Sequence, residues 1–298
     1  MQLDWNDMRV FLAVARNESL SAAGRALQVD PATVGRRVAR LEDALGAPLF
    51  AKSPQGYALT DAGQRLQIHA ERAEQAMQSA QDAMTGTEAG LSGQIRIGAP
   101  DGVANFLLPQ VCAQICAENP DLDIQIVALP RVFNLSRREA DMAVTVSQPT
   151  AGRLTVQKIT DYALHLAASK DYLRHNPSLT KQADLNAHRV IGYIPDMIFD
   201  KELDYLGEVG LTRVPLASNS VSVQLNAIRQ GAGVGIVHDF SLPAAPGLTR
   251  VLTDKISLTR SFYLVRHADD RRLDRLSRFA AALIAGLRHE VARLEALA

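Results

Sequence analysis

Residues 21–45 read SAAGRALQVDPATVGRRVARLEDAL, and this stretch decides the expected fold of the N-terminal part of the chain. Two short helical patterns meet in it across residues 28–30. We expect Asp30 to cap the second helix and Pro31 to take its first position, because each residue type is favoured there. Apolar residues recur on the second helix at steps of four and three: Val34, Val38, Leu41 and Leu45. One face of this helix should therefore lie against a core, in a helix-turn-helix arrangement.

The other face of the second helix combines small residues with arginines. It carries, in order, Ala32, Thr33, Gly35, Arg36, Ala39 and Arg40, while Arg37 lies nearer the apolar edge. Such a face can approach a major groove, since guanidinium groups pair with guanine edges or phosphates. An ordinary amphipathic helix would show the same basic, solvated face, so this stretch alone leaves both interpretations open.

The segments on either side of this helix pair add a cap and a hairpin. We expect Ser21 to cap the first helix of the pair and to lie beside the DNA. Residues 49–60, LFAKSPQGYALT, predict two short strands around a turn at 53–56, which together form a wing. Lys52 and Ser53 would then contact phosphates, although an ordinary surface hairpin would have the same pattern.

A longer motif extends through these elements. It reads MRVFLAVARNESLSAAGRAL at 8–27, VDPATVGRRVARLEDALGAPLF at 29–50 and LTDAG at 59–63. Residues 5–63 resemble the N-terminal domain of the LysR-type transcriptional regulators, and the remainder resembles the effector domain of that family in length and order of elements. The resemblance implies a winged helix-turn-helix domain that binds double-stranded DNA and a C-terminal domain that binds a small-molecule effector. The chain departs from the family at Asp30 and Gly35, where serine is common.

Composition is compatible with this interpretation but does not decide it. The 298 residues predict two or three compact units. Basic and acidic residues balance at 32 each, so DNA affinity must come from the placement of charge. Cys112 and Cys116 lie in an apolar helical pattern, which favours burial over redox sensing. We expect neither a signal peptide nor a membrane span, and a cytoplasmic location.

A long helix is expected from Thr60, as its cap, to about Thr85. Within it a heptad seam runs through Leu66, Ala70, Ala73, Met77, Ala80 and Met84. A seam of this kind needs a partner helix, and a second copy of the chain would also present two recognition helices to two DNA half-sites. We therefore expect a homodimer or homotetramer, with packing inside one chain as the alternative. Residues 86–93, GTEAGLSG, predict a hinge.

After residue 93, predicted strands alternate with predicted helices. The expected strands are 94–99, 122–129, 142–146, 162–168, 189–193, 213–217, 233–237 and 261–267; the expected helices are 106–117, 135–140, 170–175, 222–230 and 270–297. This order predicts an α/β fold with a parallel sheet and right-handed crossovers. Two similar halves would form a two-lobed clamp of the periplasmic-binding-protein kind, which the resemblance also implies.

The expected domain boundaries follow from these elements. Residues 1–60 form the winged helix-turn-helix domain, 61–93 the linker helix and hinge, and 94–298 the effector domain. Lobe I comprises 94–160 and 266–298, and lobe II comprises 161–265. Ligands of open parallel sheets bind beyond the carboxyl ends of the strands. The candidate ligand-binding residues at those ends are Asp101, Gly102, Ser147, Tyr193, Asn219, Ser220 and His238.

Three of these candidate residues have a specific chemistry. Asn219 and Ser220 precede a helix whose free amide groups would suit a carboxylate, and Asp101 could bind a hydroxyl or an amine. A capping or turn role explains each single residue equally well.

Enzymatic motifs are weak in this sequence. The GAGVG at 231–235 follows a helix and precedes a strand, the reverse of the dinucleotide-binding order. The seven histidines show no metal-ligand spacing, and no GxSxG occurs. We expect no catalysis, metal or cofactor, but a DNA-binding regulator with RNA polymerase as a candidate further partner. The alternative is a solute-binding protein with a fused dimerisation helix.

Overall fold

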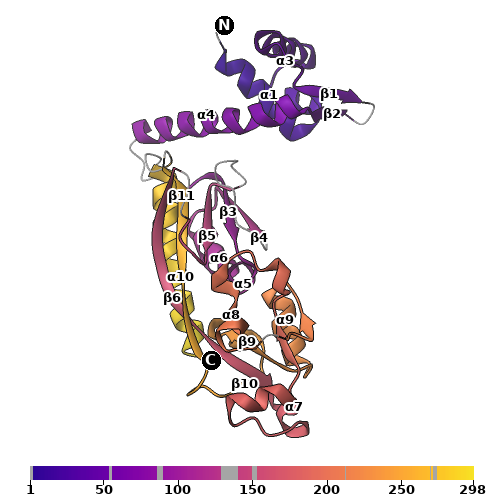
Figure 1. Cartoon of the computed structure of the whole chain (residues 1–298). Helices are drawn as coiled ribbons and strands as arrows, with labels where there is room; N and C mark the ends of the chain where they lie inside the picture. Colours follow the sequence, from indigo (N-terminus) through magenta and orange to yellow (C-terminus); the bar gives the residue numbers. More distant parts are fainter. Residues whose placement is uncertain are drawn as a thin grey trace. The chain divides into compact units, whose positions relative to one another are not determined.

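The computed structural model describes residues 3–53, 56–85, 90–128, 140–149, 153–211, 213–268, 270 and 274–298. The chain divides into two compact units, Met1–Glu88 and Ala89–Ala298 (Figure 1). None of the helices in the described residues combines the length and the apolar character of a membrane span.

The described residues of the first unit form four helices and a two-stranded antiparallel sheet. These elements are α1 (Trp5–Asn17), α2 (Leu20–Leu27), α3 (Pro31–Leu45), β1 (Phe50–Ser53), β2 (Gly56–Leu59) and α4 (Asp61–Thr85). Phe11 of α1, Val34 and Leu41 of α3, and Phe50 of β1 are buried in one core. The predicted helix-turn-helix with a wing is therefore present, and the apolar stripe of α3 faces the core as expected.

Local capping determines where α3 begins and ends. The Asp30 Oδ1 atom accepts a hydrogen bond of 2.7 Å from the amide of Ala32, and Pro31 is the first helical residue. Gly46 ends the helix in the left-handed region at φ 66°. The predictions for Asp30 and Pro31 are confirmed, because each depends on residues within one turn of the helix.

The predicted cap of α2 was wrong by two residues. Ser19, not Ser21, precedes the helix, and its Oγ accepts a 3.3 Å hydrogen bond from the amide of Ala22. The helix begins earlier because Leu20 packs against the core of the first unit. Ser21 is exposed in the first turn.

The wing is fixed to the turn between α1 and α2. The amide of Tyr57 donates a 2.9 Å hydrogen bond to the carbonyl of Glu18. Gly56 has φ 136°, and a Cβ at this position would lie 2.5 Å from the same carbonyl oxygen. Glycine is required by both the backbone angle and the close approach. The wing is therefore held by backbone contacts that a larger residue would break.

The expected α4 seam is divided between two environments. Thr60 caps α4 as predicted, since its Oγ1 accepts a 3.0 Å hydrogen bond from the amide of Gly63. Ala70 is fully buried and Leu66 packs partly against the same core, so these two positions serve the chain's own first unit. Met77 is 50% exposed and Ala80 is also exposed, while Ala73 is half-buried. The side chain of Met84 lies outside the described residues.

The second unit is built on one mixed sheet. Its strands are β3 (Gly93–Ala99), β4 (Leu122–Ala128), β5 (Met142–Thr145), β6 (Leu154–Ser169), β7 (Val190–Gly192), β8 (Leu216–Ala217), β9 (Val234–His238), β10 (Leu248–Arg250) and β11 (Ser257–His267). The order is β4-β3-β5-β11-β6-β9-β7-β8, with β10 also paired to β6. Pairs within β3–β5 and β7–β9 are parallel, whereas β6 and β11 run antiparallel to their neighbours. The expected parallel pairing is therefore present within each lobe, whereas the two strands that cross between the lobes are antiparallel.

Helices flank this sheet. They are α5 (Asp101–Phe106), α6 (Leu108–Glu118), α7 (Lys170–His175), α8 (Tyr205–Glu208), α9 (Val221–Arg229) and α10 (Asp274–Glu295), with short 3-10 helices between them. The helix expected at 106–117 is α6, which begins two residues later, at Leu108, and a separate helix, α5, precedes it. The break at Leu107 fits Pro109, which has no amide hydrogen to continue α5. The helix expected at 135–140 falls almost entirely outside the described residues.

Strands β6 and β11 connect the two lobes. All 11 residues of β11 pair with β6, and the register shifts between Phe262 and Tyr263. The expected lobe boundaries at 160 and 265 lie inside these two strands, so each strand belongs to both lobes. Helix α10 runs alongside them (Figure 1).

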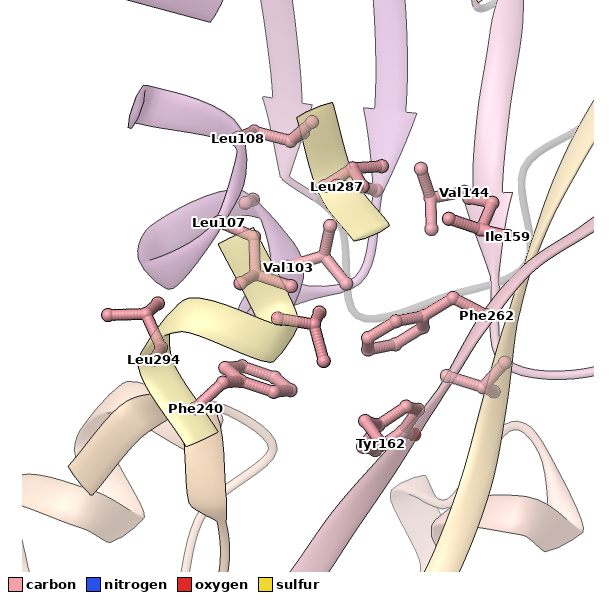
Figure 2. Close-up of a cluster of buried hydrophobic side chains, with 14 of the residues drawn as sticks. Val103, Leu107, Leu108, Val144, Ile159, Tyr162, Phe240, Phe262, Leu287 and Leu294 are labelled. Atoms are coloured by element: carbon pink, nitrogen blue, oxygen red, sulfur yellow. The ribbon is translucent and has the colours of Figure 1, made fainter. Parts of the chain in front are cut away.

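The apolar core is continuous where the lobes meet. The rings of Tyr162 on β6 and Phe262 on β11 stack with their centroids 4.0 Å apart. Phe240 and Leu294 approach the same cluster from lobe II and from α10 (Figure 2). Strands β6 and β11 are therefore covered by large buried side chains where they pass between the lobes.

Candidate DNA-binding surface and ligand cleft

The outward face of α3 is defined by its buried face. Val34 and Leu41 are buried, which leaves Ala32 and Arg36 exposed on the opposite side. Thr33 is half-buried, and its Oγ1 accepts a 3.0 Å hydrogen bond from Nη2 of Arg36. This small, polar surface carries the positive charge of Arg36, which pairs with no acidic side chain in the described part of the chain.

Arg40, by contrast, binds the chain's own acids. Its Nε and Nη2 donate 2.5 Å hydrogen bonds to the two carboxylate oxygens of Asp7, and Nη2 also lies 3.1 Å from Oδ2 of Asp4. Arg37 Nη1 is 3.9 Å from Oδ1 of Asp7. Asp7 is only 2% exposed, so these arginines neutralise a buried carboxylate of α1. The geometry gives Arg40 a role in fixing α1 to α3.

Gly35 lies at the edge of the outward face of α3, beside α2. It is half-buried, and a Cβ built on it would lie 3.4 Å from Cδ1 of Leu20. The glycine lets α2 and α3 approach closely. A serine at this position would place its side chain against Leu20. Asp30 is exposed at the tip of α3. Of the wing residues, Lys52 and Ser53 belong to β1, but their side chains lie outside the described part of the chain.

The cleft candidates of the second unit meet across the lobes. Asp101 begins α5 in lobe I, and Ser220 caps α9 in lobe II. Asp101 Oδ2 accepts hydrogen bonds from Ser220 Oγ (3.1 Å), the Ser222 amide (3.0 Å) and Ser222 Oγ (3.1 Å). Asn219 is half-buried next to this cap. Sequence reasoning selected Asp101 and Ser220 but could not show that they bind each other.

Ser147 also forms a contact between the lobes. Its Oγ donates a hydrogen bond to Oδ2 of Asp200 in lobe II. The Oδ1 atom of Asp200 caps the next 3-10 helix through the amide of Glu202 at 3.0 Å. Asp200 was not predicted, because nothing in the sequence separates it from an ordinary capping aspartate.

His238 ends β9 and is buried beside Gly102 of α5. It is 5% exposed, and a Cβ built on Gly102 would lie 3.6 Å from its Cε1. The Tyr205 hydroxyl is 3.4 Å from Nε2, whereas Nδ1 has no hydrogen-bond partner among the described residues. Burial lowers the pKa of His238 to about 4, although the carboxylates of Asp239 and Asp101 oppose this shift. His238 is therefore neutral at pH 7.

Tyrosines surround His238. Burial raises the pKa of Tyr162, Tyr193 and Tyr205 above the ordinary range, so all three hydroxyls stay protonated. The Tyr162 hydroxyl has no hydrogen-bond partner among the described residues. The wall of the cleft thus carries uncharged groups that can hydrogen-bond.

A cavity of about 300 Å³ lies within lobe II beside Tyr193. It is lined mainly by apolar side chains, among them Ile198, Leu203, Leu206, Leu211, Val214 and Ile236. Gln224 of α9 and Tyr205 supply polar groups at its wall. Tyr193 was predicted, whereas Ile198, Leu203 and Leu211 were missed because they lie in or beside short 3-10 and irregular segments without a helical or strand period.

The two cysteines differ in exposure. Cys112 is buried, as expected, and Cys116 is half-buried. Burial raises the pKa of the Cys112 thiol to about 12, with a smaller contribution from the neighbouring Cys116. The Cys112 thiol is therefore protonated at neutral pH and a poor nucleophile.

Two family models match the chain. "Bacterial regulatory helix-turn-helix protein, lysR family" matches residues 5–64, and "LysR substrate binding domain" matches residues 88–288. The helix-turn-helix match decides against a solute-binding protein with a fused dimerisation helix.

Curated relatives carry similar descriptions. The regulator DgdR of Burkholderia cepacia is 33% identical over 148 residues, 49% of each chain. The probable regulator LtrA of Klebsiella pneumoniae is 24% identical over 238 residues, 79% of this chain and 77% of its own. DgdR is thus similar over about half its length, and LtrA over about three quarters.

Solved structures share the fold. A Corynebacterium glutamicum OxyR C206 mutant has a TM-score of 0.68 at 18% identity, covering 99% of this chain and 96% of that one. The full-length Vibrio cholerae virulence activator AphB has a TM-score of 0.55 at 22% identity, covering 95% and 99%. Together with the matched family models, the helix-turn-helix and the two-lobed unit show that this chain belongs to the LysR family of DNA-binding transcriptional regulators.

Proposed function

We propose that the exposed face of α3 reads a pseudo-palindromic DNA site and that Arg36 is its principal base-contacting residue. The observation that carries this proposal is the contrast between Arg36, which is exposed opposite the buried face of α3, and Arg40, which is bound to Asp7. An exposed arginine on a recognition helix can pair bidentately with guanine in the major groove. Ala32 and Thr33 permit close approach, and Asp30, Ser21, Arg37, Lys52 and Ser53 lie at the edge of this surface or on the wing.

The proposed assembly is a dimer, or a dimer of dimers, joined through the second half of α4. Met77 and Ala80 are the exposed members of the heptad seam, and Ala73 borders them. Two copies would place two α3 helices on two half-sites. In this scheme residues 1–60 bind DNA, 61–93 link and dimerise, and 94–298 bind the effector, in the bacterial cytoplasm where the DNA lies.

The proposed effector site lies between the lobes of the second unit. Asp101, Gly102, Ser147, Ser220 and His238 converge there from both lobes. A ligand with different affinities for the open and closed clamp would shift the population between these states and thereby change the grip on DNA. Contact of the DNA-bound protein with RNA polymerase would convert this change into a change in transcription.

A footprinting experiment tests the proposal. DNA from the region upstream of the chain's own gene is incubated with the wild-type protein and with Arg36→Ala, beside scrambled DNA of equal length. The wild type should protect two half-sites one or more helical turns apart, about 10 base pairs per turn. Absence of protection at low salt, or equal protection of the scrambled fragment, would overturn the proposal.

A further inference from the structure

The carboxylate of Asp101 lies where the sequence alone predicted a ligand carboxylate. Its Oδ2 accepts three hydrogen bonds from the first residues of α9, namely from Ser220 Oγ and from the amide and Oγ of Ser222. Its Oδ1 accepts a 3.1 Å hydrogen bond from Asn105 Nδ2 on its own helix. Both oxygens of this side chain are therefore hydrogen-bonded.

The start of α9 is a favourable place for an anion. Helix N-termini have unpaired amide groups and a partial positive charge, and α9 is 9 residues long. Hydrogen bonds to a carboxylate are shorter and stronger than those between neutral groups. Since Asp101 belongs to lobe I and α9 to lobe II, the anion at this position is supplied by the opposite lobe of the same chain.

A second carboxylate joins the lobes in the reverse direction. Asp200 of lobe II accepts the hydrogen bond of Ser147 in lobe I. The two serine–aspartate contacts therefore come from both sides of the cleft. The closed arrangement needs no bound ligand to satisfy these groups.

The space directly behind Asp101 is occupied by its neighbours. A Cβ built on Gly102 would lie 3.6 Å from His238 Cε1 and 3.8 Å from Val221 Cγ1, so α5 packs directly against the first residue of α9. The same Cβ built on Gly102 would lie 3.8 Å from buried His238 Nδ1, which has no hydrogen-bond partner among the described residues. The group that still lacks a hydrogen bond is thus the uncharged imidazole of His238. The start of α9, which favours a negative charge, is already occupied by the carboxylate of Asp101.

We propose that Asp101 determines ligand specificity by acting as a built-in anion: it closes the lobes without an effector and excludes carboxylates and other small anions from the N-terminus of α9. The regulatory meaning of this closure rests on the proposed function, but the contact itself does not. The effectors admitted to the closed cleft are then molecules without a negative charge at this position. An anionic ligand would first have to displace Asp101.

Chemical rescue tests this proposal. The full-length Asp101→Ala protein is examined by hydrogen–deuterium exchange at the peptide covering residues 219–224, with and without sodium formate. Removal of the carboxylate should speed exchange there about tenfold, the change expected for about 1.4 kcal/mol of lost local stabilisation. Formate should restore protection in the variant, whereas sodium chloride at equal ionic strength should not. Formate should leave the wild type unchanged, because Asp101 already fills the position.

A matched control shows whether the change in exchange is specific to Asp101 or follows the removal of any aspartate that accepts backbone hydrogen bonds at the start of a helix. Asp184 also accepts backbone hydrogen bonds, from Thr180 and Lys181, at the start of another short helix in lobe II. Asp184→Ala should leave exchange at 219–224 unchanged and should create no formate effect at that peptide. If Asp101→Ala does not fold, Asp101→Ser is titrated in the same way.

Three results would overturn the proposal. They are unchanged exchange at 219–224 in Asp101→Ala, faster exchange that formate does not reverse, and formate protection of the wild type equal to that of the variant. DNA retardation by the wild-type protein is measured in parallel. Its absence would refute the proposed function while leaving the exchange result for Asp101 intact.

Discussion

The guanidinium of Arg40 and the carboxylate of Asp7 face each other through two hydrogen bonds of 2.5 Å. Asp7 is buried in α1 and Arg40 extends from α3, so this pair sets how the two helices cross. A charge that looks available for DNA in the sequence is thus already paired with acidic residues of the same chain, although its side chain is exposed. Loss of the Arg36 side chain should consequently affect DNA binding, whereas loss of the Asp7–Arg40 pair should affect the stability of the first unit.

Replacing Arg36 with alanine should weaken specific DNA binding by about 1–3 kcal/mol without changing the melting temperature, because its side chain is exposed. Fluorescence anisotropy with the upstream DNA fragment measures the affinity. Arg229→Ala, which removes an equal charge from the second unit, is the control. Unchanged affinity in Arg36→Ala would remove this residue from the contact surface.

Replacing Asp7 with alanine should lower the free energy of unfolding of the first unit by about 1–3 kcal/mol, since buried hydrogen bonds to a charged group are lost. Chemical denaturation followed by circular dichroism measures this change. Asp43→Ala removes an exposed acid from α3 and should have little effect. Equal stability of the two variants would contradict a structural role for the Asp7–Arg40 pair.

Replacing Met77 with glutamate should dissociate the assembly, because an exposed seam residue would bring like charges together between two copies of α4. Light scattering after size-exclusion chromatography gives the molar mass. The control is Ile68→Glu, an exposed apolar position nine residues earlier and therefore on the opposite side of the helix. A dimer that survives Met77→Glu would place the interface elsewhere.

Acidification should destabilise the second unit through His238. The unfolded chain protonates this histidine near the ordinary pKa of 6.5, whereas the folded chain does so only near 4. The unfolded state therefore holds more protons between these values, and the unfolding free energy falls by about 1.4 kcal/mol for each unit of decreasing pH. Melting curves of the wild type and His238→Gln from pH 7 to 4 should diverge accordingly. His175→Gln, at an exposed histidine, should follow the wild type.

The parts of the fold that depend on neighbouring residues could be predicted. Asp30, Pro31 and Gly46 bound α3 through contacts within one turn, so their residue types were sufficient. The cap of α2 was misassigned because Ser19 and Ser21 are equally good caps, and the burial of Leu20 decides between them. The residue type therefore predicts the helix cap only where a single nearby residue is able to act as one.

The parts that depend on distant pairing could not be predicted. The extension of β6 back to Leu154 results from pairing with β11, which lies about a hundred residues later. The contact of Asp101 with Ser222 spans 121 positions, so the sequence could place each residue at the cleft but could not pair them. The face of Gly35 likewise depends on the position of Leu20.

The paired strands β6 and β11 also limit how the second unit can deform. Since all 11 residues of β11 pair in register with residues of β6, lobe opening that preserves this ladder would be spread as small changes of strand twist over many backbone angles. No individual residue then acts as a pivot, and the elastic resistance grows with the amplitude of opening. The lobes should return to the same closed geometry after each cycle of ligand release.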